Sequence, residues 1–355
     1  MTFHFTVRDD KQIRVIIDTD ADCEADDPFA IAQALLTPKF MVKAICAEHF
    51  NEAGSMERSF RTASTVVQLL NSDVPVLEGA RTPLAGLHLA SDEDLSPASR
   101  AILDEALSAD THPLFVLCLG AITNVAAAIK LHPEIVSRMT IIWIGTQLPG
   151  NDEEAIREFN SGNDVEGANL VLTSGANLWL VPYQVYRTMN VSIAELQCKL
   201  ADAGAIGEFL FDNLVKYNDS DFAFWTSGES WSLGDSPAVG LAMKHDCGEF
   251  HYAPAPLVKP DSSTAFIPSR PTIRIYDSID SRFILEDLFA KLTLFARGCR
   301  PDNMRPPTVT PPIGATRLFT IEITTGRPPL CGTGSATLGD WCSVPPDPGT
   351  EHHST

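Results

Sequence analysis

The stretch RVIIDTDADCEADDPFAI, residues 14–31, decides both the fold and the site that we expect on it. Its apolar start at 14–18 predicts a strand buried on both faces, because the apolar run is continuous and does not alternate. Pro28 directly follows two aspartates and predicts the first turn of a helix. Between strand and helix lie carboxylates at positions 18, 20, 22, 24, 26 and 27. The order strand, acidic loop, helix is therefore expected.

The same alternation of strands and helices continues through the first half of the chain. Further strands are predicted at 42–50, 74–79, 114–120, 140–145 and 178–182, and helices at 28–37, 53–71, 94–109, 123–131 and 165–175. Alternating elements of this kind predict an α/β fold, with an open, mostly parallel sheet flanked by helices. After residue 182 the pattern is mainly helical, with a strand and a last helix within 270–296. Ligands of such sheets bind at the carboxyl ends of the strands.

Composition narrows the class of protein. The 355 residues carry 26 Lys+Arg and 46 Asp+Glu, a net charge of −20, which argues against a surface for nucleic acid or an anionic membrane. No apolar run reaches the roughly 18 residues of a membrane helix, and the start does not read as a secretory signal. The eight cysteines form no CxxC pair. We therefore expect a cytoplasmic protein.

The composition changes near residue 298. Residues 298–355 contain 10 of the 25 prolines and no long periodic segment. This predicts one domain at 13–297, followed by a disordered Pro/Thr/Gly-rich tail at 298–355. A gene-model artefact would give the same pattern.

The acidic loop indicates a cation site. Asp18 and Asp20 point to the same side of an extended segment, because side chains repeat every two residues. Several carboxylates at one strand end repel each other unless a cation or protons neutralise them. Oxygen ligands favour Ca²⁺ or Mg²⁺. The alternatives are a solvated acidic loop and, for Asp26 or Asp27, a helix N-cap.

The motif DTD…DDPFAI resembles the N-terminal signature of the nucleoside hydrolases, DTDPGxDDAxAI, with two extra residues between DTD and DD. Four more blocks are similar to segments of that family and extend the resemblance over about residues 13–296. They are VPVLEGARTPL (74–84), LGAITNVAAAI (119–129), IIWIGTQLPGN with EFN (141–160) and GDSPAV (234–239).

The resemblance implies a nucleoside-hydrolase-like fold and a set of site residues. Ca²⁺ would be held by Asp20, Asp27, Asp235 and the backbone carbonyl of Thr123, with Asp20 also acting as the catalytic base. The ribose would be bound by Asp26, Asn151, Glu158 and Asn160. Purely structural roles are the alternatives: Thr123 and Asp235 could cap helices, and Glu158 could lie in a surface loop. Family members are commonly dimers or tetramers, so a homo-oligomer is implied.

The side of the site that faces the leaving group departs from the family. Gly234 stands where purine-preferring members often have a histidine. His49 lies near the place of a family asparagine; we expect it to face the mouth of the site, although it could simply be a polar residue at a strand end. Trp225 and Trp231 precede Asp235 and could wall the pocket against a leaving group or belong to the core.

The resemblance therefore implies Ca²⁺-dependent hydrolysis of the N-glycosidic bond of a ribonucleoside or related N-riboside, giving ribose and a free base. The chemistry agrees, because carboxylates stabilise the positive charge that develops on the sugar ring during this reaction. The alternatives are a metal-dependent ribose-binding protein without turnover and a hydrolase of another ribosyl conjugate.

Overall fold

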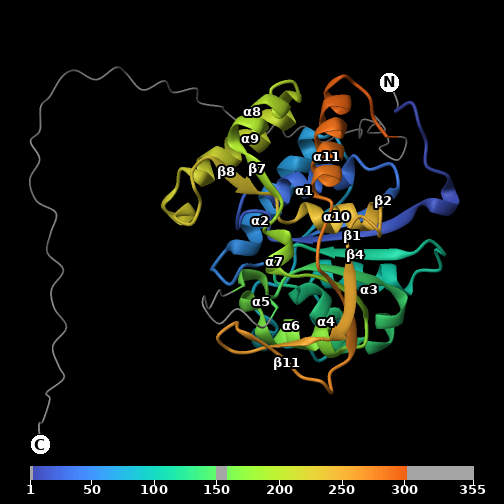
Figure 1. Ribbon diagram of the computed structural model, residues 1–355. Helices are drawn as coiled ribbons and strands as arrows, with labels where there is room; N and C mark the ends of the chain where they lie inside the picture. The colour runs from blue at the N-terminus through green and yellow to red at the C-terminus, as the bar shows by residue number, and fades with distance from the viewer. Residues whose placement is uncertain (1–2, 149–157, 302–355) are drawn as a thin grey trace, which may run out of the picture. The chain divides into compact units, whose positions relative to one another are not determined.

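A computed structural model describes residues 3–148 and 158–301 (Figure 1). At its centre is an eight-stranded sheet with the order β3-β2-β1-β4-β5-β6-β12-β9. Neighbouring strands run parallel, except for β9, which pairs antiparallel with β12 at the edge. The strands are β1 (Ile13–Thr19), β2 (Phe40–Ala47), β3 (Val76–Leu77), β4 (Leu114–Cys118), β5 (Thr140–Ile144), β6 (Asn177–Val181), β9 (Phe250–Pro254) and β12 (Thr272–Tyr276).

Helices cover both faces of the sheet (Figure 1). One apolar core lies between the sheet and α1 (Asp27–Leu35), α2 (Ser55–Leu69), α8 (Ile193–Leu200), α9 (Gly204–Asn218), α10 (Ser236–Met243) and α11 (Ser281–Ala296). The other core lies between the sheet and α3 (Pro97–Leu107), α4 (Thr123–Leu131) and α6 (Val165–Thr173). Within β1, Val15 and Ile17 enter the first core and Ile16 the second. A strand buried on both faces explains the continuous apolar run.

The predicted α/β fold with a mostly parallel sheet is confirmed. The second half contains more strand than expected, namely β9 and the antiparallel pairs β7 (Asn190–Ser192) with β8 (Ser230–Ser232) and β10 (Pro256–Val258) with β11 (Thr264–Phe266). These strands have three to five residues, too few to show a period. Short helices complete the described chain: α5 (Phe159–Asn163), α7 (Tyr183–Tyr186) and 3-10 turns at Asp9–Lys11, Leu84–Gly86, Asp92–Asp94, Pro133–Arg138 and Asp221–Ala223.

The domain extends beyond its predicted end at residue 297. Cys299 and Pro301 are buried. The backbone carbonyl of Arg300 accepts a hydrogen bond from the Phe3 amide at 3.1 Å, and the Arg300 guanidinium donates to the carbonyl of Leu70 at 2.9 Å. The predicted boundary is thus too early, and residues 302–355 of the predicted tail lie outside the described residues. Within 3–148 and 158–301, no helix is long and apolar enough to cross a membrane.

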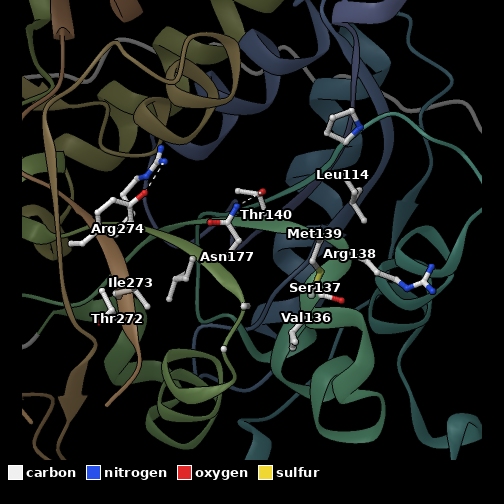
Figure 2. Close-up of a pocket in the computed structure, with 15 residues that line it drawn as sticks. Leu114, Val136, Ser137, Arg138, Met139, Thr140, Asn177, Thr272, Ile273 and Arg274 are labelled. Carbon is white, nitrogen blue, oxygen red and sulfur yellow. Dashed lines mark hydrogen bonds between the residues drawn. The ribbon is translucent and has the colours of Figure 1, made fainter. Parts of the chain in front are cut away.

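A cavity of about 390 Å³ lies at the amino ends of β4, β5, β6 and β12 (Figure 2). Leu114, Thr140, Asn177 and Thr272, the first residues of these strands, line it. The guanidinium of Arg274, also in its wall, lies 4.1 Å from the ring centroids of both Trp179 and Phe250. No acidic residue lines this cavity among the described residues. The predicted site residues lie instead at the carboxyl ends of the strands.

Candidate metal and substrate site

A small pocket, about 60 Å³, opens where the central parallel strands end. Because β1, β4, β5 and β6 are parallel neighbours, the segments after them meet at one edge of the sheet. The beginnings of α1 and α10 and the short helices α5 and α7 close the pocket. The lining residues are Asp20, Cys23, Glu24, Asp26, Asp27, Leu119, Ile144, Phe159, Asn160, Tyr186, Gly234 and Asp235.

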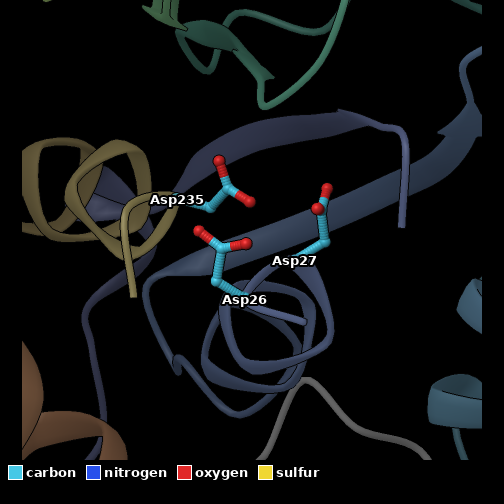
Figure 3. Close-up of side chains that lie close together, drawn as sticks. All are labelled: Asp26, Asp27 and Asp235. Carbon is cyan, nitrogen blue, oxygen red and sulfur yellow. The ribbon is translucent and has the colours of Figure 1, made fainter. Parts of the chain in front are cut away.

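Three of the aspartates converge from two helix starts (Figure 3). Asp26 and Asp27 stand at the beginning of α1 and Asp235 at the beginning of α10, and one carboxylate oxygen from each lies within 4.8 Å of the others. Asp26 and Asp235 occupy N-cap positions, but neither side chain makes a capping hydrogen bond. A role as helix N-caps therefore accounts for the positions of these two aspartates in the sequence, but it does not account for the direction in which their carboxylates point.

Asp20 adds a fourth carboxylate directly after β1. Its side chain is buried, and its Oδ2 has no hydrogen-bond partner among the described residues. Gly120, which follows β4, leaves room for it, since a Cβ at that position would lie 2.9 Å from Cγ and Oδ1 of Asp20. A buried carboxylate oxygen without a partner is costly and fits an oxygen ligand of a cation.

The electrostatics of the four carboxylates also fit a cation. Burial raises the pKa of Asp20, Asp26 and Asp235 well above the ordinary value, and repulsion among the carboxylates raises it further. Burial raises the pKa of Asp27 to about 6, although the hydroxyl of Thr19 donates to its carboxylate. Without a cation, several of these groups would hold protons. A hard divalent ion would remove the repulsion and restore the anionic form.

A second, buried layer supports the acidic loop. The side-chain amide of Asn124 donates to Asp18 Oδ1 at 2.9 Å, and the backbone amide of Asn124 donates to Glu48 Oε1 at 2.9 Å. Burial raises the pKa of Asp18 to about 6 and that of Glu48 well above its usual range. This layer fixes the end of β1 against the start of α4. Sequence reasoning missed Glu48, which lies within the strand predicted at 42–50 and directly after the observed end of β2 at Ala47.

Thr123 and His49 lie outside the pocket lining. The Thr123 hydroxyl donates to Asp164 Oδ2 at 2.6 Å and lies 2.9 Å from His49 Nε2. His49 Nδ1 accepts a hydrogen bond from the Asn51 amide at 3.1 Å, which assigns the proton to Nε2. Burial lowers the pKa of His49 to about 4. The expectation that His49 faces the mouth is wrong, because both ring nitrogens are engaged in a fully buried cluster.

The predicted ribose residues separate into two groups. Asn160 lines the pocket, and its side-chain amide donates to the carbonyls of Leu119 at 2.8 Å and Ile144 at 2.9 Å. Glu158 lies behind the lining, buried, and accepts hydrogen bonds from the backbone amides of Thr146, Asn160 and Ser161 and from the hydroxyls of Ser161 and Tyr186. Its carboxylate therefore holds α5 in place. Asn151 lies outside the described residues.

The predicted tryptophans do not line the pocket either. Trp231 is buried, 5.0 Å from the ring of Trp225 and 5.5 Å from that of Tyr217. Trp225 is 50% exposed. The aromatic side chains that reach the pocket are Phe159 and Tyr186, which only the folded arrangement reveals.

Gly234, which directly precedes Asp235, lines the pocket. A Cβ at this position would lie 3.1 Å from Cδ2 of Tyr186 and 3.3 Å from Oδ2 of Asp26. The ring of Tyr186 thus fills the space into which a side chain at 234 would extend.

Comparisons with known proteins agree with this architecture. The fold matches a purine-preferring ribonucleoside hydrolase from Gardnerella vaginalis with a TM-score of 0.67 and 21% identity, covering 81% of this chain and 100% of that one. It matches the plant nucleoside hydrolase PpNRh1 with a TM-score of 0.65 and 21% identity, covering 79% and 99%. At these identities the matches show a shared fold.

The sequence identifies the family. The model of the inosine-uridine preferring nucleoside hydrolases matches residues 15–288, and the chain belongs to this family. Among curated relatives, the non-specific ribonucleoside hydrolase RihC of Salmonella typhimurium is 29% identical over 186 residues, which are 47% of this chain. The match spans 59% of the length of that relative.

Proposed function

We propose that this protein hydrolyses the N-glycosidic bond of a ribonucleoside or related N-riboside in a Ca²⁺-dependent reaction that gives ribose and a free base. The observation that carries the proposal is the convergence of Asp20, Asp26, Asp27 and Asp235 in one pocket at the carboxyl edge of the sheet. Membership of the nucleoside hydrolase family and the ribonucleoside hydrolases among its relatives support it.

Asp20, Asp27 and Asp235 would hold the cation. We keep the backbone carbonyl of Thr123 as the proposed fourth ligand, although Thr123 is not among the residues that line the pocket. An all-oxygen donor set built from carboxylates and a carbonyl suits Ca²⁺. When bound, the ion supplies a fixed position for the ribose diol and makes water more acidic.

The side chains of the pocket would perform the remaining steps. Asp20 takes the proton of the attacking water, and Asp26 and Asn160 orient the sugar. The C1′–N bond breaks as positive charge develops on the ribose ring, and the surrounding carboxylates stabilise that charge. Burial favours this because electrostatic interactions strengthen when water is excluded.

A panel of ribosides tests the proposal by release of reducing sugar, with Ca²⁺ or with EDTA. Sugar release that EDTA abolishes and Ca²⁺ restores supports a hydrolase. Asp20→Asn should lower turnover by at least about 100-fold, the low end for loss of a general base. Riboside binding without sugar release would instead establish a ribose-binding protein.

The absence of any paired cysteine among the six described ones supports a reducing compartment such as the cytoplasm, which we include in the proposal.

A further inference from the structure

The cavity at the amino ends of β4, β5, β6 and β12 is separate from the acidic pocket at their carboxyl ends (Figure 2). Each of these strands has five residues, which places its two ends about 13 Å apart at about 3.3 Å per residue. The cavity measures about 390 Å³, against about 60 Å³ for the acidic pocket. Sites for small organic ligands measure about 300–1,000 Å³. The cavity therefore has room for a ligand, and the proposed hydrolysis does not use it.

The lining of this cavity carries positive charge in a strongly acidic protein. The chain has 46 Asp+Glu and 26 Lys+Arg, yet the described lining residues include two arginines and no carboxylate. Figure 2 shows Arg274 and Arg138 on opposite sides of the cavity. A lining of this sign attracts anions and repels cations.

Arg274 is held in the cavity wall without an anionic partner. Its guanidinium lies 4.1 Å from the ring centroids of Trp179 and Phe250, and both contacts fix its orientation. No carboxylate among the described residues forms a salt bridge with it, and its Nε is buried with no hydrogen-bond partner. A charged donor that lacks an acceptor is costly. A guanidinium oriented in advance and left unpaired is suited to bind an oxyanion.

A tyrosine hydroxyl stands beside the guanidinium. Nη2 of Arg274 donates to Tyr252 Oη at 3.3 Å, and Nη1 donates to Tyr276 Oη at 3.5 Å. The Tyr276 hydroxyl donates its own hydrogen to the His245 carbonyl at 3.3 Å. The Tyr252 hydroxyl has no such acceptor among the described residues, and this side chain lines the cavity and is 64% exposed. Arg274 and Tyr252 thus offer neighbouring N–H and O–H donors to two oxygens of a carboxylate or phosphate.

The rest of the lining suits an uncharged molecular body. The side-chain amide of Asn177 donates to Thr140 Oγ1 at 2.8 Å, which leaves the hydrogen of the Thr140 hydroxyl available to a ligand (Figure 2). Apolar side chains form most of the remaining wall; they are Pro113, Leu114, Val136, Met139, Leu178 and Ile273. Burial of apolar ligand surface against them adds to the binding energy.

We propose that this cavity is a binding site for a small organic anion. Its carboxylate or phosphate group binds to Arg274 and Tyr252, and its apolar body lies along the amino ends of β4, β5 and β6. The exposed Arg138 at the far side attracts the same charge over a longer range. The site is independent of the proposed hydrolysis, because no described residue lines both the cavity and the acidic pocket.

Calorimetric titration with phenyl phosphate, benzoate and phenol tests this inference. Calcium-free buffer prevents the probes from binding to an ion in the acidic pocket. Each anion should bind at one site per chain, and phenol should bind at least about tenfold more weakly, because it lacks the charged group. The tighter of the two anions identifies the head group as phosphate or carboxylate.

Variants locate the bound anion. Arg274→Gln should weaken both anions by at least about tenfold, as loss of a charge-assisted hydrogen bond. Arg282→Gln is the matched control, because it removes an exposed arginine of α11 outside the cavity, and it should leave binding unchanged. Tyr252→Phe keeps the exposed ring, removes only the hydroxyl and should weaken binding about fivefold. This variant decides the question if Arg274→Gln does not fold.

Three results would overturn the inference. The first is that the anions bind the unmutated protein no more tightly than phenol, which would leave Arg274 a purely structural role. The second is that neither Arg274→Gln nor Tyr252→Phe weakens the anions. The third is that Asp20→Asn changes anion binding as much as Arg274→Gln does, which would place the anion in the acidic pocket. None of these measurements requires a riboside, so failure of the proposed hydrolysis is detected separately.

Discussion

Substituting Gly120 by alanine should displace Asp20, the proposed general base, without changing its chemical identity. A Cβ at position 120 would lie 2.9 Å from Cγ and Oδ1 of Asp20, about 0.5 Å closer than the 3.4 Å at which ordinary van der Waals contact begins. The carboxylate must therefore move by about that distance. Gly120 follows β4, whose position is fixed by neighbours on both sides, so the side chain of Asp20 should yield before the backbone does.

The size of the expected loss in rate follows from how strongly catalysis depends on the position of the catalytic group. A displacement of about 1 Å typically costs about 100-fold in rate, so about 0.5 Å should cost about tenfold in kcat/KM. The apparent affinity for Ca²⁺ should fall as well, because the same carboxylate is a proposed ligand. The assays are sugar release at saturating Ca²⁺ and calcium titration by calorimetry.

Gly86→Ala is the matched control, because its Cβ would meet only the side chain of Thr82, with Oγ1 at 3.0 Å, outside the pocket lining. It should leave rate and calcium affinity unchanged. If Gly120→Ala retains the full rate and calcium affinity at an unchanged melting temperature, Asp20 does not occupy the role assigned to it.

Three further predictions concern the cation, the domain boundary and pH. Calcium should raise the melting temperature of the unmutated protein, with about 2.7 kcal/mol of stabilisation at 100 times the Kd, and Asp27→Ala should abolish that shift in differential scanning calorimetry. A chain truncated after Pro301 should keep its melting temperature, whereas truncation after Ala296 should lower it, because the deleted residues include the buried Cys299; equal melting curves would restore the earlier boundary. Burial lowers the pKa of His49 to about 4 in the folded state, so the stability that its neutral form contributes above pH 6.5 should be lost as pH falls toward 4. In urea titrations the stability difference between the unmutated protein and His49→Gln should shrink by up to about 3 kcal/mol over that range, and a constant difference would contradict the assignment.

The sheet was predictable because its strands are buried on both faces. The apolar runs at 14–18, 114–120, 140–145 and 178–182 each became a central strand, since a chain covered on both sides needs apolar residues throughout. Strand β9 was not predictable, because it lies at the edge and its first three residues are exposed. Its pairing with β12 depends on a neighbour that no local pattern reveals.

The acidic part of the site was predictable for a related reason. The four aspartates of the pocket lie just after a strand or just before a proline that starts a helix; they are Asp20, Asp26, Asp27 and Asp235. The parallel topology brings such positions together at the carboxyl ends of the strands. Sequence does not state the direction of a side chain in a loop. His49 turns toward Thr123 and away from the mouth, whereas the unassigned acidic residue at 24 turns into the pocket.

The contact between Tyr186 and the backbone at Gly234 restricts the order in which this pocket can change during evolution. A mutation that introduces a side chain at 234 would place its Cβ 3.1 Å from the tyrosine ring, so the ring must shift by a few tenths of an ångström, and a change at 186 that makes room should favour such a mutation. The two positions are 48 residues apart in the sequence but should be inherited as a pair. Exchange of either residue alone between relatives should produce a poorer enzyme than exchange of both.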